Sequence, residues 1–256
     1  MTFEWIRVPA GGPVGHDFEI AKYPVTNEQY AFYLRSLSPR EASAAYCRLM
    51  EEHFFGGIMK DYSVKPGFEK KPVVFVSWYD AQAFAAWAGA RLPSAAEWRK
   101  AAAWLPAESR YAAYCTGKDE PPTQSEAVFY DDDNGWALPA PHLADVDWYA
   151  SSGTYGLCGM AGNVAEWVDD AADSKAKLFA GWRLTLGGSL FRPVEQTLTT
   201  AQEGDAPEKR LSTFGFRLAR LRSVRFGGGV ATAKENVVKY RLCVKTLLTC
   251  SRMIYR

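Results

Sequence analysis

Residues 156–167 constrain the fold of this chain more than any other stretch. They read Gly-Leu-Cys-Gly-Met-Ala-Gly-Asn-Val-Ala-Glu-Trp. Gly162 permits a backbone conformation that a side chain would oppose, and Asn163 can hydrogen-bond to its own backbone. Trp167 supplies a large ring for burial. The stretch therefore predicts a tight turn that leads into a short strand or turn of the core.

Helix starts are indicated by three pairs of residues with the spacing of a capping box, in which two side chains satisfy free N–H groups. The pairs are Thr26 with Gln29, Ser77 with Asp80, and Ser94 with Glu97. Apolar residues follow the second and third pairs at helical spacing. Gly89 ends the second pattern, and Pro93 prevents its continuation. We therefore expect a helix after each pair.

Strands are expected at 18–23, 183–186 and 216–220, and the last two could pair with each other. Residues 39–71 contain several Pro and Gly and predict an insertion loop. Residues 104–155 show little periodicity and predict a long connection. A loop of that length in a compact domain is usually functional or held in place by other elements.

Four motifs follow one another in a recognisable order. Residues 91–98 read Arg-Leu-Pro-Ser-Ala-Ala-Glu-Trp, residues 186–189 read Leu-Gly-Gly-Ser, and residues 214–220 read Phe-Gly-Phe-Arg-Leu-Ala-Arg. Together with the 156–167 motif they resemble the formylglycine-generating-enzyme family of sulfatase-modifying factors, a branch of the C-type lectin fold. The resemblance covers roughly residues 3–220.

This resemblance implies an α+β fold, with two main helices packed on a small twisted antiparallel sheet and much irregular structure. The domain would span 1–220, and 221–256 would form a tail. That tail holds eight Lys/Arg and one acid, whereas the rest of the chain holds 22 bases and 28 acids, so their net charges are +7 and −6. A basic tail indicates either an acidic partner or a solvated segment that keeps the protein soluble.

Two arginines within the motifs, Arg91 and Arg217, are expected to be buried against acids such as Glu97 or Glu166. A buried guanidinium must be paired, because an isolated charge is very costly away from water. These residues therefore specify the fold rather than a reaction.

Calcium is a further implication of the resemblance, since family members hold it on the central turn. Calcium takes six to eight oxygen ligands. One site would use Asp147, the carbonyl of Tyr149 and an oxygen from the 131–134 run, represented by Asp132 and Asn134. The alternative interpretation of the acidic run is a solvated turn.

The second implied calcium site would use residue 159, the carbonyls of Gly162 and Val164, and Glu166. The family has Asp or Asn at the first of these positions, and this chain has Gly159. One side-chain oxygen is therefore missing from this site.

The chain lacks the residues that the oxidase chemistry of the family requires. Oxidase members use a cysteine pair after the Gly-Gly-Ser motif to bind copper, since Cu(I) prefers soft thiolates. No cysteine lies between residues 159 and 242, and the five in the chain form no CxxC motif. The related branch that uses three His to hold iron is not matched by His16, His53 and His142, which are widely separated.

Other chemistries are also unsupported by motifs. The chain has no GxSxG, P-loop or HExxH pattern. Basic residues of the domain are not interleaved with aromatics, which argues against a nucleic-acid surface. No apolar run reaches the length of a membrane span. No secretory signal is visible either, which favours a cytoplasmic or virion-associated protein.

Some family members are the variable proteins of diversity-generating retroelements, in which the segment between Gly-Gly-Ser and Gly-Phe-Arg contacts ligand. Here that interval is 190–213, with 207–210 similar to the pattern of such proteins. Aromatic, Arg and small polar side chains suit adaptable recognition. The candidate contact residues are Phe191, Arg192, Val194, Glu195, Gln196, Thr197, Thr199 and Gln202.

The sequence therefore favours a non-catalytic protein that displays the 190–213 segment to a protein or surface ligand. The alternative is a metal-dependent oxidoreductase of the formylglycine-generating type with another set of ligands, or a decayed paralogue of one. No cofactor is fixed by the residues, and calcium is the one that the resemblance suggests.

The absence of thiols after Gly-Gly-Ser leads to a first prediction. Because residues 190–198 hold no cysteine, the purified protein should not bind Cu(I) tightly at this place. Titration with Cu(I) against a competing chelator measures this. A one-to-one complex that survives the chelator would contradict the prediction.

Overall fold

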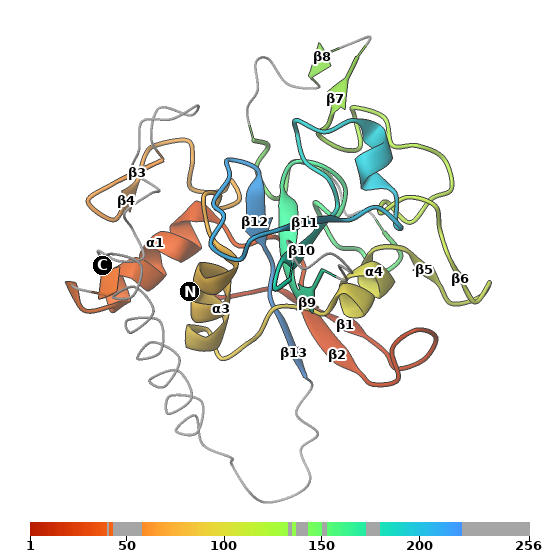
Figure 1. The fold of residues 1–256 in the computed structure, drawn as a ribbon, viewed down its shortest axis with the longest axis horizontal. Coiled ribbons are helices and arrows are strands. Elements are labelled where there is room, and N and C mark those ends of the chain that lie inside the picture. Colours follow the sequence, from red (N-terminus) through yellow and green to blue (C-terminus); the bar gives the residue numbers. More distant parts are fainter. Residues whose placement is uncertain are drawn as a thin grey trace, which may run out of the picture.

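The computed structural model describes residues 1–39, 41–42, 58–132, 135–136, 143–149, 153–172 and 180–221. Three helices, several short strands and long loops make up this part of the chain, which is a mixed α+β fold (Figure 1). The helices are α1 (Asn27–Ser36), α3 (Trp78–Trp87) and α4 (Ala95–Ala103). Within these described ranges, no helix has the length and apolarity of a membrane span. Apart from Leu221, the expected tail lies outside them, as do residues 40 and 43–57 of the expected insertion loop.

Each helix begins where its capping pair predicts. Thr26 accepts a hydrogen bond from the backbone N–H of Gln29, whose side chain accepts one from the backbone of Thr26. The same reciprocal arrangement caps α3 and α4. The prediction of three helix starts is confirmed, and the described ranges hold one α-helix more than the two main helices that the resemblance implies.

Two sheets lie at the centre of the molecule. A three-stranded sheet has the order β1 (Trp5–Val8), β2 (Phe18–Ala21) and β13 (Ala219–Leu221). A four-stranded sheet has the order β11 (Glu203–Asp205), β10 (Arg183–Leu186), β9 (Ala165–Ala171) and β12 (Phe214–Phe216). The neighbours in both sheets are antiparallel, except that β12 runs parallel to β9.

The loops around these sheets contain short hairpins. They are β3 (Met59–Lys60) with β4 (Ser63–Val64), β5 (Trp104–Leu105) with β6 (Arg110–Tyr111), and β7 (Tyr130–Asp131) with β8 (Gly135–Trp136). The long connection expected at 104–155 thus contains two of these hairpins and little other regular structure.

The expected pairing of 183–186 with 216–220 is wrong. β9 lies between β10 and β12, and the second segment divides into β12 and β13, which belong to different sheets. The division falls at Arg217, whose side chain is fully buried, and Leu218. A strand that crosses from one sheet to the other cannot keep a single partner along its length.

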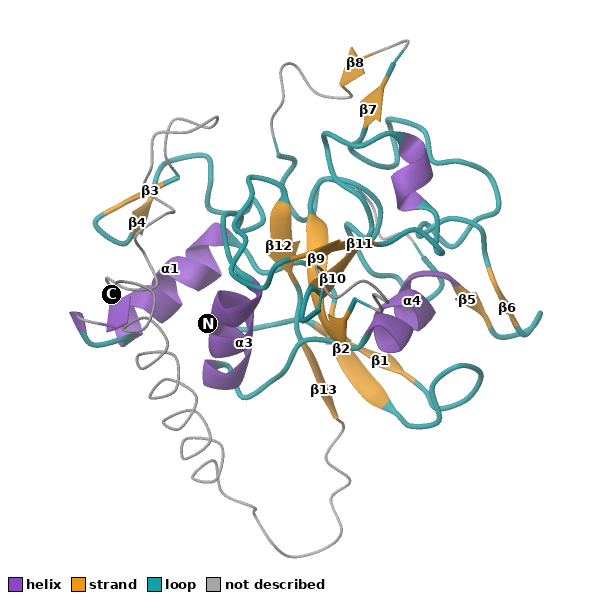
Figure 2. Ribbon diagram, viewed as in Figure 1, coloured by secondary structure: helices purple, strands orange, loops and turns teal. Residues whose placement is uncertain are grey.

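The core lies on both faces of the four-stranded sheet. Trp167 packs in a cluster with α1 and α3, whereas Val168, next along β9, packs in a second cluster with α4. Figure 2 shows α1 and α3 on one side of this sheet and α4 on the other. β9 is therefore a central strand buried on both faces, although the sequence predicts only a short strand or turn there.

The central turn before β9 has the strained geometry that its sequence predicts. Gly162 has φ of 69°, and a Cβ there would approach the carbonyl oxygen of Val128 to 2.1 Å. Asn163 also has positive φ, 61°. Its side chain does not bond to its own backbone as expected: Oδ1 accepts from the N–H of Ala144 at 3.0 Å and Nδ2 donates to the Ala144 carbonyl at 3.2 Å. The amide therefore holds a distant loop against the turn.

Two buried tryptophans yield a prediction on stability. Trp167 donates from Nε1 to the Val76 carbonyl at 3.0 Å, and Trp98 donates to Glu166 Oε2 at 2.8 Å. Truncation of either to Ala should lower the free energy of unfolding by about 3–5 kcal/mol, because it leaves a large cavity. Denaturant midpoints measure the loss.

The matched control is Trp148→Ala, because 59% of Trp148 is exposed. Its replacement should change stability by no more than about 0.5 kcal/mol. Losses below about 1 kcal/mol for both buried tryptophans would show that they do not occupy the core.

Candidate functional site

The 190–213 segment connects β10 to β12, which lie on opposite sides of β9. After the Gly187-Gly-Ser189 turn it forms the short 3-10 helix η2 (Val194–Thr197), returns as β11 along β10, and then enters β12 (Figure 1). β11 is an edge strand, with Glu203 opposite Thr185 of β10. The segment therefore begins and ends in the sheet and also pairs with it midway.

Buried anchors fix the backbone of the segment. Leu190 is fully buried, and its N–H donates to the Asn163 carbonyl at 3.1 Å. The Thr197 carbonyl accepts from the N–H of Cys115 at 2.9 Å. Thr199 donates from Oγ1 to the Ala112 carbonyl at 2.9 Å. These contacts tie the segment to the turn before β9 and to the loop around residues 112–115.

Two of the expected contact residues are therefore corrected. Thr197 and Thr199 are buried, at 0% and 4% exposure, and cannot meet a ligand at the surface. Their hydroxyls are used inside the domain, since Thr197 Oγ1 donates to the Val194 carbonyl at 2.6 Å. Polar residues of a loop are usually exposed, but a hydroxyl can be buried at low cost when it donates a hydrogen bond to a backbone carbonyl.

Three other candidates are exposed and lie on the surface of the segment. Arg192 forms an ion pair from Nε to Glu203 Oε1 at 2.9 Å. Gln202 accepts from Arg99 of α4 through Oε1 at 2.6 Å. Glu195 is the third exposed side chain. A ligand on this surface would meet charged and amide groups from both the segment and α4.

Phe191, Val194 and Gln196 are half-buried. Phe191 packs against the cluster that contains α1 and α3, and Val194 packs against the cluster of α4. The backbone of Gln196 lies against Gly188, where a Cβ would approach its carbonyl oxygen to 2.9 Å. These three residues contribute partly to packing and partly to the surface.

The end of the segment is held by α3. Arg210 donates from Nη2 to Asp80 Oδ1 at 3.0 Å. Asp80 also accepts from Ser77 in the capping box, so one carboxylate serves both the helix and the segment. The Pro207 carbonyl accepts from the N–H of Trp78 at 3.0 Å. The sequence pattern at 207–210 does not indicate this contact.

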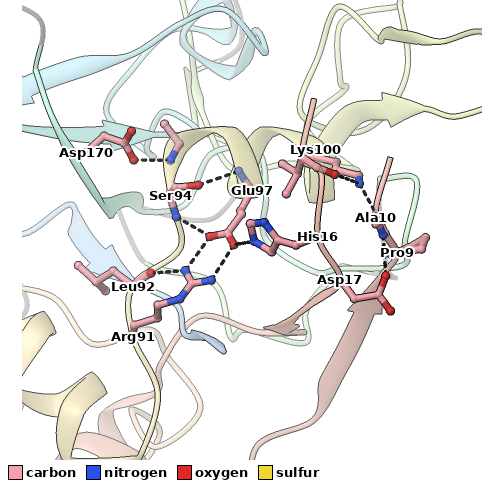
Figure 3. Close-up of polar contacts among 12 residues, drawn as sticks. Pro9, Ala10, His16, Asp17, Arg91, Leu92, Ser94, Glu97, Lys100 and Asp170 are labelled. Carbon is pink, nitrogen blue, oxygen red and sulfur yellow. Dashed lines mark hydrogen bonds and ion pairs between the residues drawn. The ribbon is translucent and has the colours of Figure 1, made fainter. Parts of the chain in front are cut away.

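A cluster of polar and charged side chains around the buried Glu97 connects α4 to its surroundings (Figure 3). Glu97 is buried and accepts two hydrogen bonds of 2.6 Å from Arg91, one at each oxygen. His16 Nε2 lies 2.9 Å from Glu97 Oε1. Burial acts to raise the pKa of Glu97, but hydrogen bonds from Arg91, the Ser94 backbone and His16 outweigh it and lower the pKa to about 2. The expected partner of Arg91 is confirmed, but its expected burial is not, because 34% of the Arg91 side chain is exposed.

One turn further along α4, the buried Lys100 ammonium is enclosed by backbone carbonyls. Nζ donates to Pro9 at 2.5 Å and to Gly11 at 2.7 Å, both in the loop between β1 and β2 (Figure 3). Burial lowers the pKa of Lys100. The N–H of Ala95 donates to Asp170 Oδ2 of β9 at 2.6 Å. Together, the Lys100 and Ala95 contacts connect α4 to the loop between β1 and β2 and to the four-stranded sheet.

The second predicted arginine pair is also confirmed. Arg217 donates from Nε to Glu166 Oε2 at 2.6 Å and from Nη2 to Oε1 at 2.7 Å, and both side chains are buried. Trp98 of α4 reaches the same carboxylate. Three of the motifs thus meet at the buried pair of Arg217 and Glu166.

Residues 7–222 match the model of the "Sulfatase-modifying factor enzyme 1-like domain". The chain belongs to this family. It is 31% identical over 220 residues to "Serine/threonine-protein kinase pkn1" of Chlamydia caviae, covering 80% of this chain and 33% of that protein. It is 38% identical over 187 residues to the "Formylglycine-generating enzyme" of Streptomyces coelicolor, covering 64% of this chain and 56% of that protein. The chain thus spans about a third of the length of the chlamydial protein.

Solved structures show the same fold. CarF superposes with a TM-score of 0.60 at 20% identity, covering 87% of this chain and 99% of that one. Treponema denticola variable protein 1 superposes with a TM-score of 0.55 at 18% identity, covering 86% and 92%. The fold is therefore the C-type lectin fold of the formylglycine-generating type, as the motifs imply.

The residues of the first implied calcium site are only partly described, and calcium there stays a prediction. Asp147 Oδ2 accepts from Lys70 Nζ at 2.9 Å, and both side chains are partly exposed. Asp132 is exposed, and Asn134 lies outside the described residues. Across the described ranges, no three His, Cys, Asp or Glu side chains gather closely enough to hold a metal ion.

The described thiols are Cys115 and Cys158, and both are buried and free. Burial raises the pKa of Cys115 to about 12, against smaller opposing effects of Thr199 and Arg99. A thiol of this kind is protonated at neutral pH and is a poor metal ligand or nucleophile. Cys47, Cys243 and Cys250 lie outside the described residues.

The geometry around Glu97 predicts an acid-sensitive contribution to stability. The pKa of Glu97 is about 2 in the folded chain, against 4.5 as its ordinary value. A carboxylate with a lowered pKa stabilises the fold above its ordinary pKa, and this stabilisation disappears as the pH falls towards the folded value. The contribution is of the order of 3 kcal/mol.

Unfolding free energies of the wild type and Glu97→Gln should therefore differ most above pH 4.5 and converge as the pH falls towards 2. Glu195→Gln is the control, because Glu195 is exposed. A difference for Glu97→Gln that does not change with pH would contradict the assignment.

Proposed function

We propose that the chain is a non-catalytic binding domain whose ligand face is the surface of the 190–213 segment. The observation that carries this proposal is the alternation of buried anchors and exposed side chains along one segment. Leu190, Thr197 and Thr199 fix the backbone, whereas Arg192 and Gln202 reach the surface. The exposed residues can therefore be exchanged without loss of the core.

A backbone fixed in this way favours recognition. Ordering loops and side chains on binding costs free energy, and a segment that is already ordered loses less. Arg is among the residues that most often dominate interfaces, since its planar group binds carboxylates and stacks on rings. Arg192 is exposed and pairs with Glu203, and the half-buried Arg99 of α4 donates to Gln202.

The oxidoreductase alternative is less well supported. The copper pair of the oxidase members has no counterpart in residues 159–242, which hold no cysteine. The buried Cys115 lies next to Thr197 in the fold, but its raised pKa keeps it protonated. A decayed paralogue of an oxidase, whose active site became a binding face, is consistent with both facts.

A narrower form of the proposal is that the chain is a variable protein of a diversity-generating retroelement. The fold shared with Treponema denticola variable protein 1 agrees with this but concerns the fold alone. A reverse-transcriptase gene beside a near-copy of the coding segment for 190–213 would support it. The ligand would then be a protein or surface group, and the tail at 221–256 could still serve an acidic partner.

Alanine substitutions separate a ligand face from a structural loop. Arg192→Ala, Glu195→Ala and Gln202→Ala should each change stability by about 0.5 kcal/mol or less, since these side chains are exposed. One or more should lower affinity at least about tenfold, because a few contacts dominate most interfaces. Protein and glycan arrays identify the ligand, and calorimetry measures the affinity of each variant.

Thr199→Val provides the opposite control, since it should destabilise the domain by removing a buried hydrogen bond. Trp148→Ala tests an exposed residue outside the segment. The proposal fails if the three exposed substitutions unfold the domain, or if affinity per folded molecule is the same for all of them. Copper-dependent oxidation of a cysteine peptide by the wild type would instead favour the oxidase.

A further inference from the structure

One arginine beside the 190–213 segment has no charged partner. Arg99 of α4 is half-buried, and its Nη2 donates to Gln202 Oε1 at 2.6 Å. Its Nε is buried without a hydrogen-bond partner, and within the described ranges Arg99 forms no ion pair. Each of the other arginines that the structure describes contacts at least one carboxylate or backbone carbonyl. Arg99 therefore keeps a positive charge that only a neutral amide contacts.

The titratable groups close to Arg99 do not neutralise this charge. Burial raises the pKa of Tyr111 and of Cys115, and the charge of Arg99 opposes the rise at both groups. The pKa of Cys115 is nevertheless about 12, so its thiol is neutral at pH 7, and the phenol of Tyr111 is neutral as well. A charge that is partly removed from water is costly unless it is paired. The surroundings of Arg99 therefore favour an anionic group from a ligand.

Helix α4 holds Arg99 in place from both sides. Its neighbours Trp98 and Lys100 are buried, and they donate to Glu166 and to carbonyls of the loop between β1 and β2. Gln202 contacts Arg99 through Oε1 alone, so its Nε2 stays available to a group that arrives from solvent. Donors that are already ordered lose little conformational entropy when a ligand binds.

A carboxylate matches these donors better than a phosphate does. A guanidinium binds a carboxylate through parallel N–H···O bonds, and the single charge of Arg99 balances the single charge of a carboxylate. A phosphate monoester carries about −1.5 to −2 at neutral pH. Arg192 does not supply a second free charge, because Glu203 pairs with it at 2.9 Å.

The exposed side chains of the segment also indicate the class of partner. Arg192, Glu195 and Gln202 are charged or amide groups. The aromatic residue Phe191 is half-buried and packs against the cluster of α1 and α3, so it offers little ring surface on which a sugar could stack. This surface therefore suits an acidic segment of a protein better than a glycan.

We propose that Arg99 and Gln202 form an anion subsite of the ligand face, and that this subsite binds a carboxylate from an acidic segment of a partner protein. The inference rests on the proposed function, because it names the chemistry that the same surface recognises. Arg99 comes from α4 and not from the 190–213 segment, so its charge stays in place when residues of the segment are exchanged.

The probes are two synthetic peptides, one of alternating glutamate and glycine and one of alternating glutamine and glycine. Nuclear magnetic resonance follows the Nε–H signal of Arg99, which burial protects from exchange with water and which Arg99→Lys identifies by its loss. For the wild type, the glutamate peptide should shift this signal and bind at least about tenfold more tightly than the glutamine peptide, because hydrogen bonds between charged groups are the stronger ones. Equal affinities, or an unchanged Arg99 signal, would overturn the inference.

Variants test whether Arg99 causes the preference. Arg99→Gln should bind the two peptides equally weakly, whereas Arg99→Lys keeps the charge and should retain part of the preference. Arg35→Gln is the matched control, because Arg35 is exposed on α1, on the other side of the four-stranded sheet (Figure 2). Melting temperatures show whether each variant folds, and the comparison of peptides with the wild type needs no variant. An undiminished preference in folded Arg99→Gln would contradict the assignment.

Inorganic phosphate and glucuronate are titrated against the same signal, and both should bind more weakly than the glutamate peptide. Tighter binding of phosphate would overturn the assignment to a carboxylate, and tighter binding of glucuronate would replace the protein partner by an acidic sugar. A ligand from the arrays that depends on Arg192 but not on Arg99 would overturn the inference and leave the proposed function standing. Arg99-dependent binding of the glutamate peptide, with no array ligand that depends on Arg192 or Glu195, would support the subsite and count against the proposed function.

Discussion

The ion pair between Arg217 and Glu166 is the interaction on which the other elements depend. Glu166 lies on the central strand β9, and Arg217 lies at the point where the chain passes from β12 to β13. Trp98 connects α4 to the same carboxylate. Both sheets and one helix thus meet at one buried charge pair. Loss of one partner in such a pair typically costs about 3–5 kcal/mol, because the other charge stays buried and unpaired.

Around this pair the domain relies on single side chains that bind distant backbone. Asn163 holds the loop at Ala144, Lys100 holds the loop between β1 and β2, and Thr199 holds the 112–115 loop. Strands of three or four residues form too few ladder bonds to fix long loops. Since buried backbone groups must be paired, side chains supply the partners that regular structure does not. Arg192 and Gln202 of the 190–213 segment instead contact other side chains, Glu203 and Arg99 respectively.

Local sequence predicted what depends on local chemistry. Thr26, Ser77 and Ser94 begin their helices because a capping box needs only residues three apart. The cost of a buried charge predicts that Arg91 and Arg217 each pair with an acid. It does not predict which of Glu97 and Glu166 pairs with which arginine. The family motifs supplied the fold class. The prediction that 183–186 pairs with 216–220 is wrong because β10 and β12 are both partners of β9. Nothing in these two segments indicates a strand between them.

The sequence by itself determined the helix starts, the C-type lectin fold and the lack of thiols after Gly-Gly-Ser. Only the tertiary structure decided which residues of the 190–213 segment face solvent. Thr199 and Thr200 are neighbours of the same type, yet one is buried on the Ala112 carbonyl and the other is exposed. The tertiary structure likewise brought the guanidinium of Arg217 to the carbonyl oxygen of Gly159. Such outcomes depend on which distant carbonyl lies within reach, and that distance exists only after the chain has folded.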